Sequence, residues 1–121
     1  MRLRRLVPLL AVVVALGCQR DPVAPDQPPD WLLSLIAEFE RQPPDYRPPV
    51  VASYVYDGAV VYYVAPRCCD VYSDLYTMAG SIVCHPDGGI TGGGDGRCPS
   101  FFATRRDERV VWTDPASRSR N

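Results

Sequence analysis

The sequence contains no lysine and only one histidine, and all of its 13 basic side chains are arginines. These charges are scattered along the chain, and the formal net charge is −1. Proteins that bind nucleic acid usually carry a basic patch or stripe, so we expect no nucleic-acid partner. The longest apolar run covers residues 6–16, which is well short of the ~20 residues of a membrane-spanning helix.

The sequence patterns of several enzyme classes are also missing. His85 is not accompanied by the nucleophile-elbow motif of a hydrolase. The acids Asp70 and Asp74, and likewise Asp107 and Glu108, lie close in sequence, but acidic side chains are common on surfaces and nothing marks these pairs as catalytic. We therefore predict a protein that is not an enzyme and that has no cofactor and no metal centre.

The first 17 residues have the layout of a secretory signal peptide, in which a positive segment precedes a short apolar one. Arginines at positions 2, 4 and 5 precede the apolar run, and the small Gly17 follows it. The segment Ala15–Cys18 then resembles the lipobox of bacterial lipoproteins, in which the cysteine is lipidated and becomes the first residue of the mature chain. This resemblance implies a membrane anchor of acyl chains, such as palmitate, on Cys18.

The residue after the lipobox bears on the membrane concerned. An Asp at that position retains enterobacterial lipoproteins in the inner membrane, so Gln19 resembles the outer-membrane type. An ordinary signal peptide and a short transmembrane anchor are the alternatives to a lipoprotein signal peptide in residues 1–17. Residues 18–29 contain four prolines and predict an extended tether, residues 30–114 a single folded domain, and residues 115–121 a disordered tail.

Four further cysteines predict two disulfides, because an even number of cysteines in an exported chain usually pairs. A bond between the adjacent Cys68 and Cys69 would be strained, so we expect each of them to reach one of Cys84 and Cys98. The sequence does not choose between the two crossed pairings. A zinc site is the competing interpretation, but the C-x₂-C spacing that is typical of such sites is missing.

The first ordered element is predicted to be a helix from Trp31 to Glu40, with Asp30 as its N-cap. Its apolar residues recur at the spacing of one helical face, which predicts that this face packs against a core. They are Leu32, Leu35, Ile36 and Phe39.

Two strands follow, over Val50–Tyr56 and Ala59–Ala65, because both segments are rich in valine and tyrosine. Asp57-Gly58 between them is a strong signal for a two-residue hairpin turn. In that register Tyr54 faces Val61, Tyr56 faces Ala59 and Ala52 faces Tyr63. We assign the face that carries Tyr54, Tyr56, Val61 and Tyr63 to the core, and expect the tyrosine hydroxyls to need partners.

A second hairpin is predicted from Leu75-Tyr76 and Ile82–Cys84 around a turn at residues 77–80. Ser100 is expected to cap one helical turn through Phe101 and Phe102, and Val110–Trp112 to form a last strand. The predicted fold is therefore α+β, with one N-terminal helix packed on a small antiparallel meander sheet that two disulfides stabilise.

The segment 86–96 is unusual because it contains six glycines in eleven residues. Its acids could hold calcium with the help of backbone carbonyls, but the spacing fits neither an EF-hand nor a calcium-binding nonapeptide. We favour a structural loop that needs positive φ angles. The residues of this possible ligand loop are Asp87, Gly88, Gly89, Gly92 and Asp95.

Several segments between Trp31 and Asp114 resemble a family of small bacterial lipoproteins that is known only as a domain of unknown function. The resemblance rests on the stretches 61–64, 66–70, 73–76 and 84–92, among which Cys-Cys-Asp and Pro-Asp-Gly-Gly are the more specific. It implies export and the limits of the domain, but no activity and no functional residues.

Three classes of function follow from these patterns. The first is a membrane-anchored, non-catalytic interaction or structural module of the cell envelope, with an unknown envelope protein or ligand as its partner. The second is a small disulfide-stabilised ligand-binding or inhibitor-like domain that uses its glycine-rich loop. The third, which the missing motifs disfavour, is a metal-dependent enzyme. A protruding glycine-rich loop would favour the second class.

Overall fold

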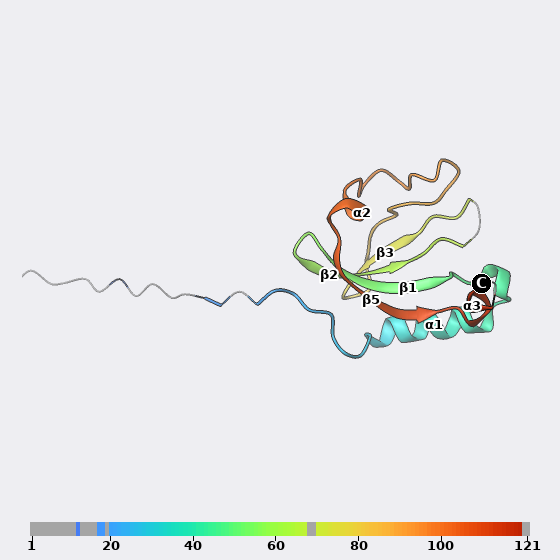
Figure 1. The fold of residues 1–121 in the computed structure, drawn as a ribbon, viewed down its shortest axis with the longest axis horizontal. Helices are drawn as coiled ribbons and strands as arrows, with labels where there is room; N and C mark the ends of the chain where they lie inside the picture. Colours follow the sequence, from blue (N-terminus) through green and yellow to red (C-terminus); the bar gives the residue numbers. More distant parts are fainter. Residues whose placement is uncertain (1–11, 13–16, 19, 68–69, 120–121) are drawn as a thin grey trace, which may run out of the picture.

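The computed structural model describes residues 12, 17–18, 20–67 and 70–119 of the chain (Figure 1). The described residues form helices and an antiparallel five-stranded sheet, which confirms the mixed α and β architecture. In chain order the elements are α1 (Asp30–Arg41), the 3-10 helix η1 (Pro44–Tyr46), β1 (Val50–Tyr56), β2 (Ala59–Val64), β3 (Asp74–Thr77), β4 (Ile82–Cys84), α2 (Phe101–Thr104), β5 (Arg106–Thr113) and α3 (Pro115–Arg118). No helix in this described part is long and apolar enough to cross a membrane.

The hairpin of β1 and β2 has the predicted register. Tyr56 pairs with Ala59 and Tyr54 with Val61. The two turn residues Asp57 and Gly58 have φ angles of 49° and 75°, as a two-residue turn with positive φ at both positions requires. The sequence prediction of this hairpin is therefore confirmed.

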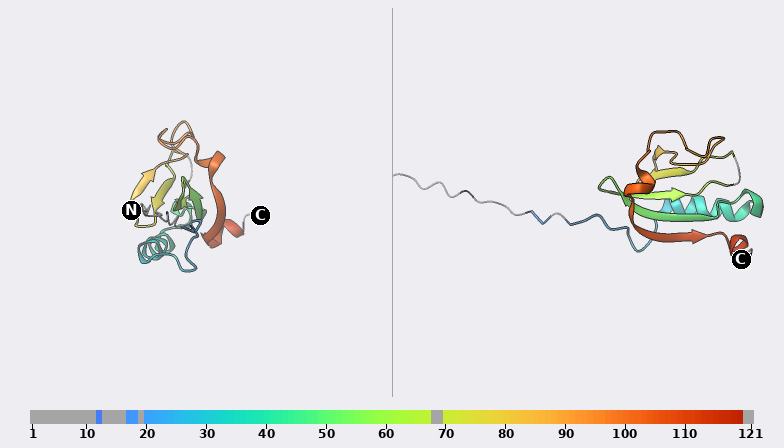
Figure 2. Two further views of the ribbon diagram at one scale, coloured as in Figure 1. Left: turned by 90° about the vertical axis from the view of Figure 1, so that its left-hand side faces the viewer. Right: turned by 45° about the horizontal axis from the view of Figure 1, so that its top comes forward.

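The two faces of the sheet carry separate cores, where the sequence argument expected one. Helix α1 packs Leu32, Ile36 and Phe39 against the face that carries Val60 and Tyr62. The predicted face, with Tyr54, Val61 and Tyr63, is instead covered by the segment that follows β4. Figure 2 shows α1 and this segment on opposite sides of the sheet. Both faces of β1 and β2 are thus buried, because these strands are apolar at nearly every position.

The strand order is β4-β3-β2-β1-β5, so the sheet is not a simple meander. The first four strands follow one another, but β5 returns to the opposite edge and pairs with β1. To reach that edge the segment 85–105 crosses the sheet and places Cys98 and Phe101 in its core. Strand β5 is also longer than predicted, because the charged residues Arg106–Arg109 lie on an exposed edge strand where charge is tolerated.

The disulfide prediction was wrong in its pairing. Cys84, the last residue of β4, is bonded to Cys98, and both cysteines are buried. Neither can therefore pair with Cys68 or Cys69, which lie outside the described residues. The pairing follows from the crossing segment, which brings Cys98 over the sheet to a Cα–Cα distance of 6.2 Å from Cys84.

The predicted helix caps also differ from the structure. Asp30 is the first residue of α1 and not its cap, since the carbonyl of Pro29 accepts from the amides of Leu32 and Leu33. An acid in the first turn still stabilises the helix, because its negative charge lies near the positive end of the helix dipole. Ser100 precedes α2, but the amides of that helix bond to its carbonyl and not to its hydroxyl.

Both ends of the domain make contacts that the sequence did not predict. Asp114 caps the short helix α3, in the segment expected to be a disordered tail, and its carboxylate also accepts from Arg47 at 3.3 Å. The tether contacts the domain as well, because Arg109 of β5 donates to the carbonyl of Ala24 at 2.9 Å and lies 3.5 Å from the Asp26 carboxylate.

Tyrosine hydroxyls of the sheet form the hydrogen bonds that partly buried polar groups require. Tyr54 donates to the carboxylate of Glu108, and Tyr76 donates to that of Asp74 at 3.5 Å. Burial, reinforced by the neighbouring carboxylate, raises the pKa of Tyr54 to about 12 and the pKa of Tyr76 to about 12. Both groups therefore stay protonated in the folded domain to a higher pH than in the unfolded chain.

We expect these tyrosines to make the domain unstable in alkali. A raised folded pKa contributes stability that is present below the unfolded value of about 10 and is lost as the pH rises towards about 12. The urea midpoint should therefore be flat up to about pH 10 and fall above it. In the Tyr54→Phe variant, which lacks one titrating group, the fall should be shallower. A midpoint unchanged at about pH 12 would contradict the prediction.

Candidate functional site

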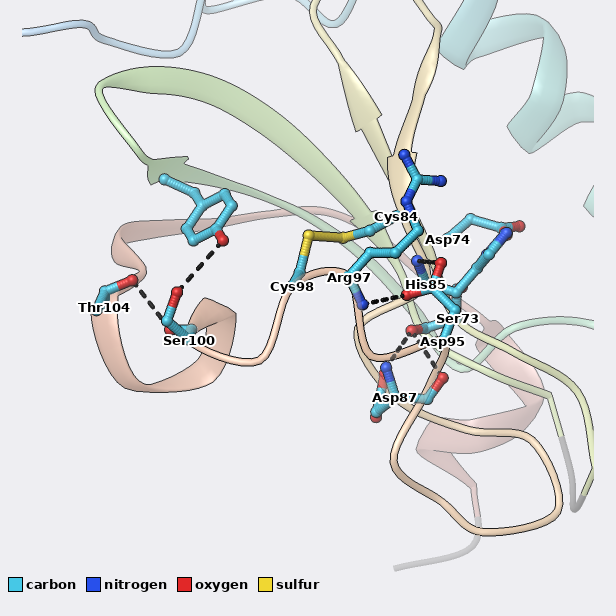
Figure 3. The surroundings of a disulfide bond; sticks show 11 residues. Ser73, Asp74, Cys84, His85, Asp87, Asp95, Arg97, Cys98, Ser100 and Thr104 are labelled. Atoms are coloured by element: carbon cyan, nitrogen blue, oxygen red, sulfur yellow. Dashed lines mark hydrogen bonds and ion pairs between the residues drawn. A yellow bond between two sulfur atoms is a disulfide. The ribbon is translucent and has the colours of Figure 1, made fainter.

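The glycine-rich loop spans residues 85–97, between β4 and the turn before α2. The Cys84–Cys98 bond closes its base, and Figure 3 shows this bond beside His85, Asp95 and Arg97 of the loop. Cys84 is fully buried under the loop and Cys98 is 6% exposed. The loop is therefore attached at both ends to the core that contains Phe101.

Backbone hydrogen bonds hold the loop in one conformation. The amide of Gly88 donates to the carbonyl of Gly92, and the amide of Gly94 donates to that of Gly88. Gly94 has a φ of 69°, and a Cβ there would lie 2.1 Å from the carbonyl oxygen of His85. Only glycine fits this position. The prediction of a loop that needs positive φ angles is confirmed.

Asp95 binds backbone amides with both of its carboxylate oxygens. Oδ2 accepts from the amide of His85 at 3.1 Å and Oδ1 from the amide of Arg97 at 3.0 Å. These bonds, with that of Arg97 as the strongest cause, lower the pKa of the Asp95 carboxyl. The amide of Asp95 in turn donates to the His85 carbonyl at 2.9 Å. Asp95 therefore ties the two ends of the loop together.

Asp87 joins the loop to the sheet. Its Oδ1 accepts from the hydroxyl of Tyr63 at 2.9 Å. Its amide donates to Oγ of Ser73 at 3.0 Å, and its carbonyl accepts from the amide and the hydroxyl of Ser73. Ser73 is fully buried. Burial and the bond to Asp87 raise the pKa of Tyr63 well above its ordinary value.

His85 lies at the base of the loop, beside the disulfide. Its Nδ1 is 2.9 Å from Oδ1 of Asp74 and 2.8 Å from the carbonyl oxygen of Ser73, and its ring stacks on Tyr72. Because both neighbours of Nδ1 are acceptors, Nδ1 carries a hydrogen and donates to them. The hydroxyl of Ser73 is bonded to Asp87 instead, so the described residues bring no activated serine to this histidine.

The sequence argument did not foresee the partners of these residues. It named Asp74 only as one of a pair of acids, with Asp70, whereas the structure pairs Asp74 with His85. The two residues are eleven positions apart, Asp74 at the start of β3 and His85 directly after β4, and no local motif links them. Of the predicted ligand loop, Asp87 and Asp95 both act as hydrogen-bond acceptors that fix the loop.

The carboxylates of the loop are thus occupied by protein donors. Among the residues that the structure describes, no three His, Cys, Asp or Glu side chains gather in a group that could hold a metal ion. Calcium requires six to eight oxygen ligands, whereas Asp87 and Asp95 provide at most four carboxylate oxygens, three of which already accept from protein donors.

We therefore expect calorimetric titration of calcium into the domain to show at most the millimolar dissociation constants of weak extracellular modules. A micromolar constant that is abolished by Asp87→Asn or Asp95→Asn would overturn this prediction. Asp26→Asn, in the tether, serves as the control for a general loss of negative charge.

The outer end of the loop is the most exposed apolar point of the described domain. Ile90 is 91% exposed, and the neighbouring residues of the tip, Thr91 and Gly92, are exposed as well. The hydroxyl of Thr91 accepts from the amide of Gly93 at 3.3 Å. A rigid backbone therefore presents one branched apolar side chain to the solvent. Sequence reasoning missed Ile90, although it is the one large apolar residue among the glycines.

Comparison with known proteins supplies a family. The model of the domain of unknown function DUF6970 matches residues 37–114. No curated protein and no solved structure matches the chain. The matched range covers more than half of the chain and includes β1 to β5 and the Cys84–Cys98 bond. It confirms the resemblance to a family of unknown function, and the lipobox-like segment lies outside it. The chain therefore belongs to the DUF6970 family.

Proposed function

We propose that this protein is a lipid-anchored, non-catalytic binding module of the bacterial cell envelope, and that its glycine-rich loop is the contact surface. The exposure of Ile90 on a rigid loop carries the proposal. Binding sites gain affinity when the contact segment is already ordered, because less conformational entropy is lost on association. An apolar side chain that projects in this way suits a pocket on a partner protein.

Two further observations support a place outside the cytoplasm. A buried disulfide that closes a loop is typical of oxidising compartments, and Cys84–Cys98 is of this kind. Cys18 is a free and exposed cysteine that precedes the proline-rich tether. Acyl chains on this residue would hold the domain at the membrane.

The anchor is tested by phase partition of the Cys18→Ala variant. We expect the wild-type protein in the detergent phase and the variant in the aqueous phase. A variant that stays membrane-bound and uncleaved would exclude lipidation as the means of anchoring. It would also require a transmembrane segment in its place.

The loop is tested separately, with a photoreactive amino acid at position 91 in cells of the source bacterium. Irradiation should join the protein to a partner, and Ile90→Asp should abolish the product without lowering the melting temperature. Val110→Asp is the matched control, because Val110 is 58% exposed on β5, outside the loop. Equal loss of the product in both variants, or no product at all, would count against the loop as the contact surface.

A further inference from the structure

An apolar groove lies between the two hairpin turns of the sheet. Its volume is about 600 Å³, within the range of ~300–1,000 Å³ that is usual for small-molecule sites. One wall comes from the β1–β2 hairpin with Val60 and Val61, and another from the β3–β4 hairpin with Met78 and Val83. The glycine-rich loop contributes no residue to this groove, so the groove is separate from the proposed contact surface.

The tether supplies the remaining wall. Pro22 and Val23 line the groove, and polar contacts hold the tether on both sides of them. Arg106 of β5 lies 4.0 Å from the Asp21 carboxylate, and Arg109 donates to the carbonyl of Ala24. Val23 is nevertheless 75% exposed. An apolar side chain is therefore held beside an apolar groove while most of its surface remains in water.

The chain length between this wall and Cys18 is short. Pro22 follows Cys18 by four residues, which span at most about 14 Å when fully extended. An acyl chain fills one leaflet of a bilayer, so its length is about half of the ~30 Å hydrocarbon core. A chain attached to Cys18 can therefore reach the groove and lie along it.

We propose that the groove holds one acyl chain of the lipid on Cys18, while the other chains remain in the membrane. The inference rests on the lipidation proposed above. Covalent attachment gives this acyl chain a high effective concentration at the groove, which a free lipid does not have. Occupation removes Val23, Met78 and Val83 from water, and it fixes the hairpin turns of the domain next to the membrane surface.

The test uses the full-length protein, labelled in growing cells with a fatty acid that carries a photoreactive group along its chain. Mass spectrometry of the purified protein first shows whether the label is on Cys18. After irradiation we expect cross-links from that chain to the peptides that contain residues 56–61 and 77–83. Label on Cys18 with cross-links to lipid alone would contradict the binding of an acyl chain in the groove, but it would still support lipidation of Cys18. Absence of label from Cys18 would overturn both proposals.

A charged residue in the lining of the groove should prevent the acyl chain from binding there without unfolding the domain. We expect Val23→Asp to lower the yield of the intramolecular cross-link by about tenfold, because an unpaired charge beside an acyl chain is unfavourable. Val110→Asp is the control and should retain the wild-type yield, since Val110 is exposed on β5 and does not line the groove. An undiminished yield in Val23→Asp would contradict the proposed site.

Discussion

Phe101→Ala is expected to lower the free energy of unfolding by ~3–5 kcal/mol, the usual range for removing a buried aromatic ring. Phe101 is fully buried, and its ring centroid lies 5.3 to 5.7 Å from those of Tyr54, Tyr56 and Tyr63. It fills the space between the sheet and the crossing segment. Since small domains are stable by only ~5–15 kcal/mol, the variant should lose a large share of its stability and unfold at a clearly lower urea concentration.

The control is Phe102→Ala, one residue further along the same helix. Phe102 is 43% exposed, so its removal leaves no closed cavity and should cost much less. Urea unfolding followed by tyrosine fluorescence measures both variants in a soluble Cys18→Ala background. Equal losses at the two positions would contradict the burial of Phe101 between the segment 85–105 and the sheet.

Removal of the Cys84–Cys98 bond is the second large effect. The double variant Cys84→Ala, Cys98→Ala should lose ~2–5 kcal/mol, the usual cost in small exported domains. The bond closes a loop with a sequence separation of 14, and without it the unfolded chain gains conformational freedom. Hydrogen exchange should show the amide of Gly94 opening more often, because the crossing segment is no longer fastened to β4.

The single variant Cys84→Ala tests the pairing itself. It should expose a new thiol at Cys98, which alkylation and peptide mapping can locate. A new thiol at Cys68 or Cys69 would instead support one of the crossed pairings that the sequence favoured. Cys18→Ala, which lies outside the domain, should produce no new thiol among these four residues.

The elements that could be predicted from the sequence depend on neighbours along the chain. Asp57-Gly58 defines its hairpin because two residues alone must adopt positive φ. The apolar residues Leu32, Ile36 and Phe39 predict α1, because their spacing of three to four residues matches one turn of a helix and places them on one face. Alternation within β1 and β2 was harder to interpret, since both faces are apolar and the sequence cannot say which one a helix covers.

The elements that could not be predicted depend on contacts between distant residues. Arg106–Arg109 resemble a loop in their composition, and only pairing with β1 makes them a strand. The partner of Cys84 depends on the path of a segment whose glycines carry no hydrophobic pattern. The contacts of His85 with Asp74, and of Tyr63 with Asp87, require the register of several strands at once.

The return of β5 to the edge beside β1 has a consequence for the order of folding. Val50 pairs with Thr113, so β1, the first strand in the chain, is fully paired only after β5, the last strand, has joined the sheet. Strands β1 to β4 can pair with one another first, while the outer edge of β1 stays open until residues 106–113 join it. Contacts of such high sequence separation slow folding. During this interval an open, apolar strand edge is exposed to pairing with other chains, and we expect the folding protein to depend most on chaperones at this stage.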